Sequence, residues 1–270
     1  MAVEAPAPGA ATQQFMRLEK EGGVGFLTFD KPKANTYDYD FVRQLNDTVN
    51  EIRLDTDIKA VVVKSEVPRF FSAGAEISML KAATPDYKAC FCLEAQETLR
   101  KIERTPKVFI AALTGHTVGG GLEIALSMDL RFAADEGIQI GLPEINLGVL
   151  PGTGGTQRLA RLIGPARALD LMISGRLLTP SEAYDFGIVE YLYPADEVVA
   201  RATDYARKLA EGPARASGLI KLSVKEGIEV GIESGLFMER ELQNRLFRTE
   251  DAQEGLQAWL DKRTPEFKGR

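Results

Sequence analysis

Cysteine and histidine are scarce in this chain. Of its 270 residues, two are cysteine and one is histidine. Cys90 and Cys92 stand two positions apart in a segment that we expect to be helical, so their thiols point to different faces of that helix. The pair therefore predicts neither a disulfide framework nor a cysteine metal cluster, and it favours a reducing compartment.

Long apolar runs and an excess of basic charge are also absent. Charges such as Asp129 and Arg131 interrupt the best candidates for a membrane span, which needs about 20 apolar residues. The formal net charge is -6 and the 33 lysines and arginines are scattered, so we expect no nucleic-acid partner. Residues 1–13 lack the basic start and apolar run of a secretory signal, and we interpret them as a flexible tail. The sequence predicts a soluble, cytoplasmic protein with no membrane partner.

The hydrophobic share of 44% is enough for a sizeable core. Strand patterns alternate with helix patterns in the first part of the chain. We expect strands at 25–29, 59–64 and 108–113, and helices at 40–55 and 85–104. Such alternation is typical of an α/β fold with parallel strands, and we assign this core to residues 14–195.

The pattern becomes helical beyond Pro194. Apolar residues recur at helical spacing in the segments 197–211, 215–227 and 235–262, with few strand formers among them. We therefore predict a helical C-terminal subdomain over residues 196–270. Its apolar residues exceed what a short appendage buries by itself, which predicts packing against a neighbouring subunit.

Three glycine-bearing stretches stand out, namely FSAGAEI (71–77), GHTVGGGLEIAL (115–126) and PGTGGTQR (151–158). Each of them alone is compatible with an ordinary turn. They do not indicate a nucleotide site, because no Gly-Lys-Ser/Thr follows a glycine run and no G-x-G-x-x-G joins an early strand to a helix. The second stretch links a predicted strand to a predicted helix, which leaves free amides at a helix N-terminus, where anions bind. Amides from the first two stretches, converging on one carbonyl oxygen, would form an oxyanion hole.

Two glutamates are candidates for proton chemistry. Glu123 lies in the first turn after the triple glycine, where a glutamate is also favourable through helix electrostatics alone. Glu144 follows Pro143 at the end of a predicted strand, in an apolar setting where an acid must be paired or protonated. If both face one pocket, they hold a water molecule between them, and burial beside a like charge raises at least one pKa. We interpret His116 as structural, because no serine or cysteine nucleophile accompanies it.

In this order and spacing, FSAGAEI, GHTVGGGLEIAL and GLPEINLGVLPGTGGTQRL (141–159) resemble the crotonase, or enoyl-CoA hydratase/isomerase, family. The resemblance extends from about Phe15 to the end of the chain. It implies an α/β fold, a crotonase-like spiral of β-β-α turns with a helical C-terminal trimerisation region. It also implies a homotrimer or dimer of trimers, an acyl-CoA thioester substrate, and no cofactor besides the coenzyme A of that substrate.

The implied reaction is the addition of water across the 2,3 double bond of a trans-2-enoyl-CoA. Carried over residue by residue, the resemblance makes Glu123 and Glu144 the catalytic pair and assigns the oxyanion hole to the amides of Ala73 and Gly120. Further positions are implied to contact the substrate, namely Lys33, Ala34, Gly74, Ala75, Glu76, Ile77, Gly119, Pro143, Phe247 and Lys262.

Two departures from the family pattern bear on the substrate. Glu76 replaces the usual aspartate of the first motif. The usual Asn-Ala-Leu is here Asn35-Thr36-Tyr37, which adds bulk and polarity near the expected position of coenzyme A.

Other functions remain open at this stage. A double-bond isomerase needs only Glu144, so Glu123 discriminates between the two reactions. Another enolate-forming reaction, such as a decarboxylation, and a non-catalytic acyl-CoA-binding or RNA-binding scaffold are further alternatives.

Overall fold

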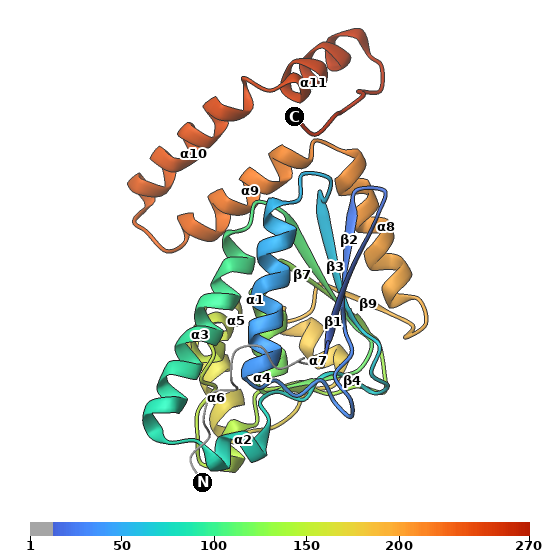
Figure 1. Cartoon of the computed structure of the whole chain (residues 1–270). Coiled ribbons are helices and arrows are strands. Elements are labelled where there is room, and N and C mark those ends of the chain that lie inside the picture. The colour runs from blue at the N-terminus through green and yellow to red at the C-terminus, as the bar shows by residue number, and fades with distance from the viewer. Residues whose placement is uncertain (1–12) are drawn as a thin grey trace.

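The computed structural model describes residues 13–270, so all but the last residue of the expected tail lies outside the described part (Figure 1). One sheet has six strands in the order β1-β2-β3-β5-β7-β9, namely Met16–Glu21, Val24–Phe29, Ala60–Ser65, Val108–Leu113, Leu130–Ala134 and Tyr191–Tyr193. The hairpin of β1 and β2 is antiparallel. The four other pairings are parallel, as the alternation of strand and helix patterns predicted.

A second, smaller sheet consists of three short strands. β4 (Phe70–Ser72), β6 (His116–Val118) and β8 (Ile140–Gly141) are parallel neighbours in that order. The chain visits the two sheets in turn, from β3 to β4, from β5 to β6 and from β7 to β8, with a helical segment after each visit. This is the expected spiral of β-β-α turns.

Helices α1 (Tyr39–Leu54) and α3 (Pro85–Arg104) cover one side of the core, where they pack on each other (Figure 1). Asp38 begins α1 by accepting the Phe41 amide, and Thr84 does the same for α3, whose first residue is a proline. The buried residues of α1 recur every three or four positions, which gives the helix one apolar face: Phe41, Val42, Leu45, Val49 and Ile52. The sequence predicted both helices to within about one residue at each end.

The remaining helical segments are short in the first two thirds of the chain and longer in the last third. They are α2 (Ile77–Ala82), α4 (Gly120–Ser127), the 3-10 helix η1 (Glu144–Leu147), α5 (Gly155–Ile163), α6 (Pro165–Ser174), α7 (Pro180–Asp185), α8 (Val198–Glu211), α9 (Ala214–Gly227), α10 (Ile232–Leu246) and α11 (Glu250–Asp261). Glu144 therefore begins a helical turn and does not end a strand, because β8 stops at Gly141.

The C-terminal region is helical, as expected, but one predicted helix is wrong. The segment 235–262 is divided into α10 and α11, because Thr249 caps the second helix by accepting the Ala252 amide. α8 packs on β3, β5 and β7, whereas α10 packs mainly on α9 and projects from the body of the protein (Figure 1). None of the side chains of α10 is buried. Within residues 13–270, no helix is long and apolar enough to cross a membrane.

A close contact at glycine lets α4 pack against the small sheet. A Cβ on Gly121, in the first turn of α4, would lie 2.1 Å from the Ser72 carbonyl oxygen at the end of β4. Only a residue without a side chain lets α4 start so close to this strand.

We expect Gly121→Ala to lower the free energy of unfolding by about 2 kcal/mol or more, because the added methyl group collides with backbone that has no room to yield. Urea unfolding followed by circular dichroism measures the change. Gly227→Ala is the matched control, since a Cβ there meets no atom within 4 Å and α9 tolerates alanine. Equal stability of the two variants would contradict the packing argument.

Candidate active site

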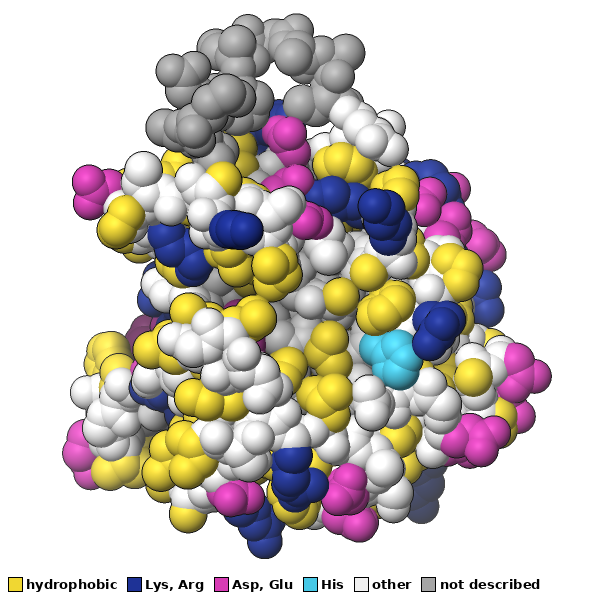
Figure 2. Space-filling view, turned by 90° about the horizontal axis from the view of Figure 1, so that it is seen from below, with side chains coloured by type: hydrophobic (Ala, Val, Ile, Leu, Met, Phe, Trp, Pro, Cys, Tyr) yellow, Lys and Arg dark blue, Asp and Glu magenta, His cyan; other side chains and the backbone are white. Residues whose placement is uncertain are grey.

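The small sheet brings three sequence motifs to one place. The chain leaves β4 into Ala73-Gly74-Ala75, leaves β6 into the triple glycine, and leaves β8 into Leu142-Pro143-Glu144. Because parallel strands end at the same edge of a sheet, these three segments meet beside one another. A cleft of about 750 Å³ opens there, and its walls include Tyr37, Ala73, Gly74, Ala75, Ile77, Gly119, Gly120, Glu123, Pro143, Glu144 and Thr153. Hydrophobic side chains gather around a hollow on the face seen in Figure 2.

Two backbone amides in the cleft are available to a ligand. Within the described residues, neither the Ala75 amide nor the Gly120 amide donates a hydrogen bond. The two lie near each other, because a Cβ on Gly74 would stand 2.8 Å from the Gly120 nitrogen. Gly74 and Gly119 both have positive φ, +85° and +56°, which aims the following amides as no ordinary L-residue would.

The Ala73 amide, which we expected to be an oxyanion donor, is not free. Its amide donates to the Ala34 carbonyl oxygen at 2.9 Å, which ties β4 to the segment before α1. A donor already engaged in a backbone hydrogen bond is not free for a substrate oxygen. Within the described residues the Gly120 amide donates no hydrogen bond, and the neighbouring free amide belongs to Ala75.

Glu123 is buried, with 1% of its surface exposed, and its carboxylate is well supplied with donors. Oε1 accepts the amides of Thr153 at 2.8 Å and Gly155 at 2.6 Å, and Oε2 accepts the Thr153 hydroxyl. Backbone amides only donate, and both oxygens of this carboxylate serve as hydrogen-bond acceptors. The glycine-rich third motif therefore supplies the partners of the glutamate from the second motif.

Glu144 has the opposite environment. Its Oε2 is buried and has no hydrogen-bond partner among residues 13–270, although it lines the cleft. Burial, and then the charge of Glu123, raise the pKa of Glu144 to about 7. The two carboxylates are thus close enough to interact, and the environment of Glu144 favours its protonated form.

The structure places the other predicted contact residues in two groups. Gly74, Ala75, Ile77, Gly119 and Pro143 line the cleft with the glutamates. Lys33, Ala34, Glu76, Phe247 and Lys262 do not line it.

The residues outside the cleft have other partners or lie elsewhere in the molecule. Glu76 bonds Thr36 and Ser78, and these hydrogen bonds lower the pKa of Glu76. Phe247 and Lys262 follow α10 and α11, at the opposite end of the molecule from α2 and α4 (Figure 1).

His116 lies near this region and has a structural role. His116 accepts the Gln139 amide through Nδ1 at 3.0 Å, and its ring packs on Phe70. This agrees with the structural role expected for it. Among residues 13–270, no group of three or more histidine, cysteine or acidic side chains is arranged to hold a metal ion.

Thr153 is the polar contact that the sequence did not predict. It gives Glu123 both its amide and its hydroxyl, and the Tyr37 hydroxyl lies 3.2 Å from the same threonine oxygen. The sequence shows a hydroxyl residue inside a glycine-rich stretch, but nothing in its spacing indicates that position 153 contacts position 123.

Known proteins resemble this chain over most of its length. The family model for enoyl-CoA hydratase/isomerase matches residues 19–270. The short-chain-enoyl-CoA hydratase of Clostridium acetobutylicum is 34% identical over 94% of this chain and 97% of its own. The 2,3-dehydroadipyl-CoA hydratase of Escherichia coli is 35% identical over 94% of this chain and 98% of its own.

A solved structure is more similar still. The crystal structure of an enoyl-CoA hydratase from Geobacillus kaustophilus superimposes with a TM-score of 0.94 at 51% identity and covers 96% of this chain and 98% of that one. With the family model matching nearly the whole described sequence, this chain belongs to the enoyl-CoA hydratase/isomerase family.

Proposed function

We propose that this enzyme adds water across the 2,3 double bond of a trans-2-enoyl-CoA. The observation that carries the proposal is the pair Glu123 and Glu144, which line one cleft in contrasting environments. An ionised acceptor and a protonated donor are what the addition of water requires, since one proton leaves the water and another is delivered to carbon.

The thioester carbonyl oxygen binds to the amides of Ala75 and Gly120. As the hydroxyl group adds to C3, negative charge moves to that oxygen and an enolate forms. Two donors fixed in place stabilise this charge without reorganising, and each is worth on the order of 3 kcal/mol in the transition state. Ala75 replaces Ala73 in this role because only its amide is free.

The glutamates divide the proton transfers. Glu123 accepts a proton from the attacking water, and Glu144 donates its proton to C2. After the addition the pair still holds one proton, now on the other glutamate, and exchange with water restores the starting state. The active form therefore carries one proton on two carboxylates, and hydration falls as the pH rises through about 7, where Glu144 loses it.

We expect Glu123→Gln and Glu144→Gln each to lower kcat for hydration of crotonyl-CoA by a factor on the order of 1,000 or more, because neither amide transfers protons as a carboxylate does. Loss of enoyl absorbance measures hydration, and calorimetry with a saturated acyl-CoA serves as the control for binding, which should change little. If only Glu144→Gln were inactive, a double-bond isomerase would replace the hydratase. Wild-type turnover in both variants would exclude this mechanism.

The oxyanion donors are tested one atom at a time. Replacing Ala75 by its α-hydroxy analogue turns its N–H into an ester oxygen, and we expect kcat to fall about 100-fold or more. The same replacement at Ala73 removes the bond to Ala34 and should lower thermal stability while leaving kcat near that of the wild type. The reverse pattern would return the role to Ala73.

Assembly is the second part of the proposal, and it rests on exposed apolar surface. The C-terminal helices leave large side chains uncovered in the single chain, with Trp259 84%, Leu260 73% and Ile232 73% exposed. Phe247 and Lys262 lie far from their own cleft, so they reach coenzyme A only from a neighbouring subunit. We propose a homotrimer or a dimer of trimers that covers this surface.

Light scattering coupled to size exclusion should therefore give three or six times the chain mass of 29.6 kDa at micromolar concentration. Trp259→Glu places a charge on this surface and should shift the mass towards smaller species. A fully active monomer would contradict the assembly and leave the hydration mechanism untouched.

A further inference from the structure

We propose that Thr153 and Tyr37 are positioning residues that hold Glu123 ionised and aimed into the cleft through a directed chain of hydrogen bonds. The inference rests on the proposed hydration, because it concerns the glutamate that accepts the proton from water. It adds two side-chain hydroxyls, from segments 116 residues apart, to the determinants of that step.

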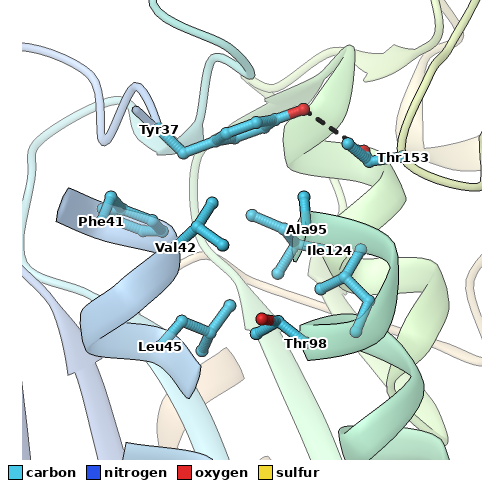
Figure 3. Close-up of a pocket in the computed structure, with 9 residues that line it drawn as sticks. Tyr37, Phe41, Val42, Leu45, Ala95, Thr98, Ile124 and Thr153 are labelled. Atoms are coloured by element: carbon cyan, nitrogen blue, oxygen red, sulfur yellow. Dashed lines mark hydrogen bonds between the residues drawn. The ribbon is translucent and has the colours of Figure 1, made fainter. Parts of the chain in front are cut away.

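The three groups are buried together. Tyr37 is 4% exposed, Thr153 3% and Glu123 1%. The Tyr37 hydroxyl oxygen lies 3.2 Å from the Thr153 hydroxyl oxygen (Figure 3). The Thr153 hydroxyl in turn donates to Oε2 of Glu123. A buried hydroxyl that contacts a carboxylate interacts with it at a low local dielectric, which strengthens the hydrogen bond.

The chemistry of the groups sets the direction of the chain. Because the amides of Thr153 and Gly155 donate to Oε1, the carboxylate is an acceptor, and the single proton of the Thr153 hydroxyl goes to Oε2. The threonine oxygen then has only acceptor capacity left, so Tyr37 must be the donor to it. Burial, and then the charge of Glu123, raise the pKa of Tyr37, so its phenol keeps this proton.

The fold holds both ends of this chain of hydrogen bonds in place. The Tyr37 amide donates to the Gly74 carbonyl oxygen at 2.9 Å, and its ring stacks on Phe91 with centroids 6.0 Å apart. The ring also fills the space beside Gly120, where a Cβ would lie 2.2 Å from ring atoms.

At the other end of the chain, Arg158 fixes the threonine backbone. It donates to the Thr153 carbonyl oxygen at 2.9 Å and is itself held by Glu103 at 2.8 Å. The backbone that carries the Thr153 hydroxyl is therefore held by an ion pair outside the cleft.

None of the other titratable side chains described around the cleft donates a hydrogen bond to Glu123 in place of Thr153. Glu144 of η1 faces the same space, but it is an acid that cannot stabilise a second carboxylate, and burial, and then like-charge repulsion from Glu123, raise its pKa. Lys88 and Cys92 of α3 also line the cleft, but the Lys88 ammonium donates to the Cys92 sulfur at 2.7 Å. Within residues 13–270, Thr153 is the only side chain that donates a hydrogen bond to Glu123.

The test is the pH dependence of kcat/KM for hydration of crotonyl-CoA. Thr153→Val keeps the shape and the amide but removes the hydroxyl, which weakens the ionised form of Glu123, and the acidic limb of the profile should move up by on the order of one pH unit. Tyr37→Phe should move it less, since its hydroxyl acts through Thr153. The basic limb, which belongs to Glu144, should stay in place, and Thr153→Ser should restore the acidic limb.

The double variant shows whether the two hydroxyls act in series, as a chain of hydrogen bonds, or independently of each other. If Tyr37 acts through Thr153, adding Tyr37→Phe to Thr153→Val should give no further movement of the acidic limb. Two shifts that add would overturn the directed chain, even if each single variant behaved as expected.

A second measurement does not depend on turnover. Infrared difference spectra follow the carboxyl C=O band as the pH falls, with the Glu123 band assigned by its loss in Glu123→Gln. Its midpoint should move up in Thr153→Val. If the wild-type enzyme hydrated no enoyl-CoA, the proposed function would fail, but this midpoint would still decide the role of the two hydroxyls.

Matched controls lie beside the chain. Thr98 of α3 borders the small apolar cavity below Tyr37 (Figure 3). Its buried hydroxyl has no hydrogen-bond partner among the residues that the structure describes, so Thr98→Val removes a hydroxyl without touching Glu123. Tyr87 stacks on Phe91 at 6.5 Å, and Tyr87→Phe serves in the same way. Neither should move the acidic limb. A uniform loss of activity at all pH values in Thr153→Val, with both limbs and the infrared midpoint unmoved, would reduce Thr153 and Tyr37 to structural residues.

Discussion

The parallel register of three short strands is the constraint on which the active site depends. β4, β6 and β8 contribute only three, three and two residues to their sheet, yet they end at a common edge. The segments 73–75, 119–121 and 142–144 meet there, because each is the first segment after one of these strands. The glycines make the meeting possible by removing the side chains that would keep β4 and α4 apart.

The contrast between the two glutamates follows from what each one meets at that edge. A buried carboxylate is costly unless it is hydrogen bonded or protonated, and the protein uses one solution for each. Glu123 receives the donors of the third motif, whereas Glu144 stands at the start of η1 with an oxygen that finds none among the described residues. Burial, and then repulsion from Glu123, raise the pKa of Glu144.

The C-terminal helices differ in how much of their surface is buried, although their sequences show the same helical pattern. α8 buries Val198, Ala202 and Ala206 against the six-stranded sheet and so completes the core of this chain. α10 buries none of its side chains, although Leu236 and Phe237 are apolar. A boundary drawn from composition near residue 195 therefore separates helical from mixed sequence, but it does not separate core from appendage.

Local pattern alone determined a large part of this protein. The amphipathic period and caps of α1 and α3, the apolar runs of β3 and β5, and the glycine–glutamate motifs that identify the family are readable in the sequence, because each depends on neighbours a few residues away. Only the tertiary structure decided which amide is free at the first motif, since the bond from Ala73 to Ala34 joins two separate segments. The same is true of Thr153 and Tyr37 at Glu123, and of the break between α10 and α11. Hydrogen bonds across such distances leave no periodic trace in a sequence, because they depend on where the folded backbone brings each donor.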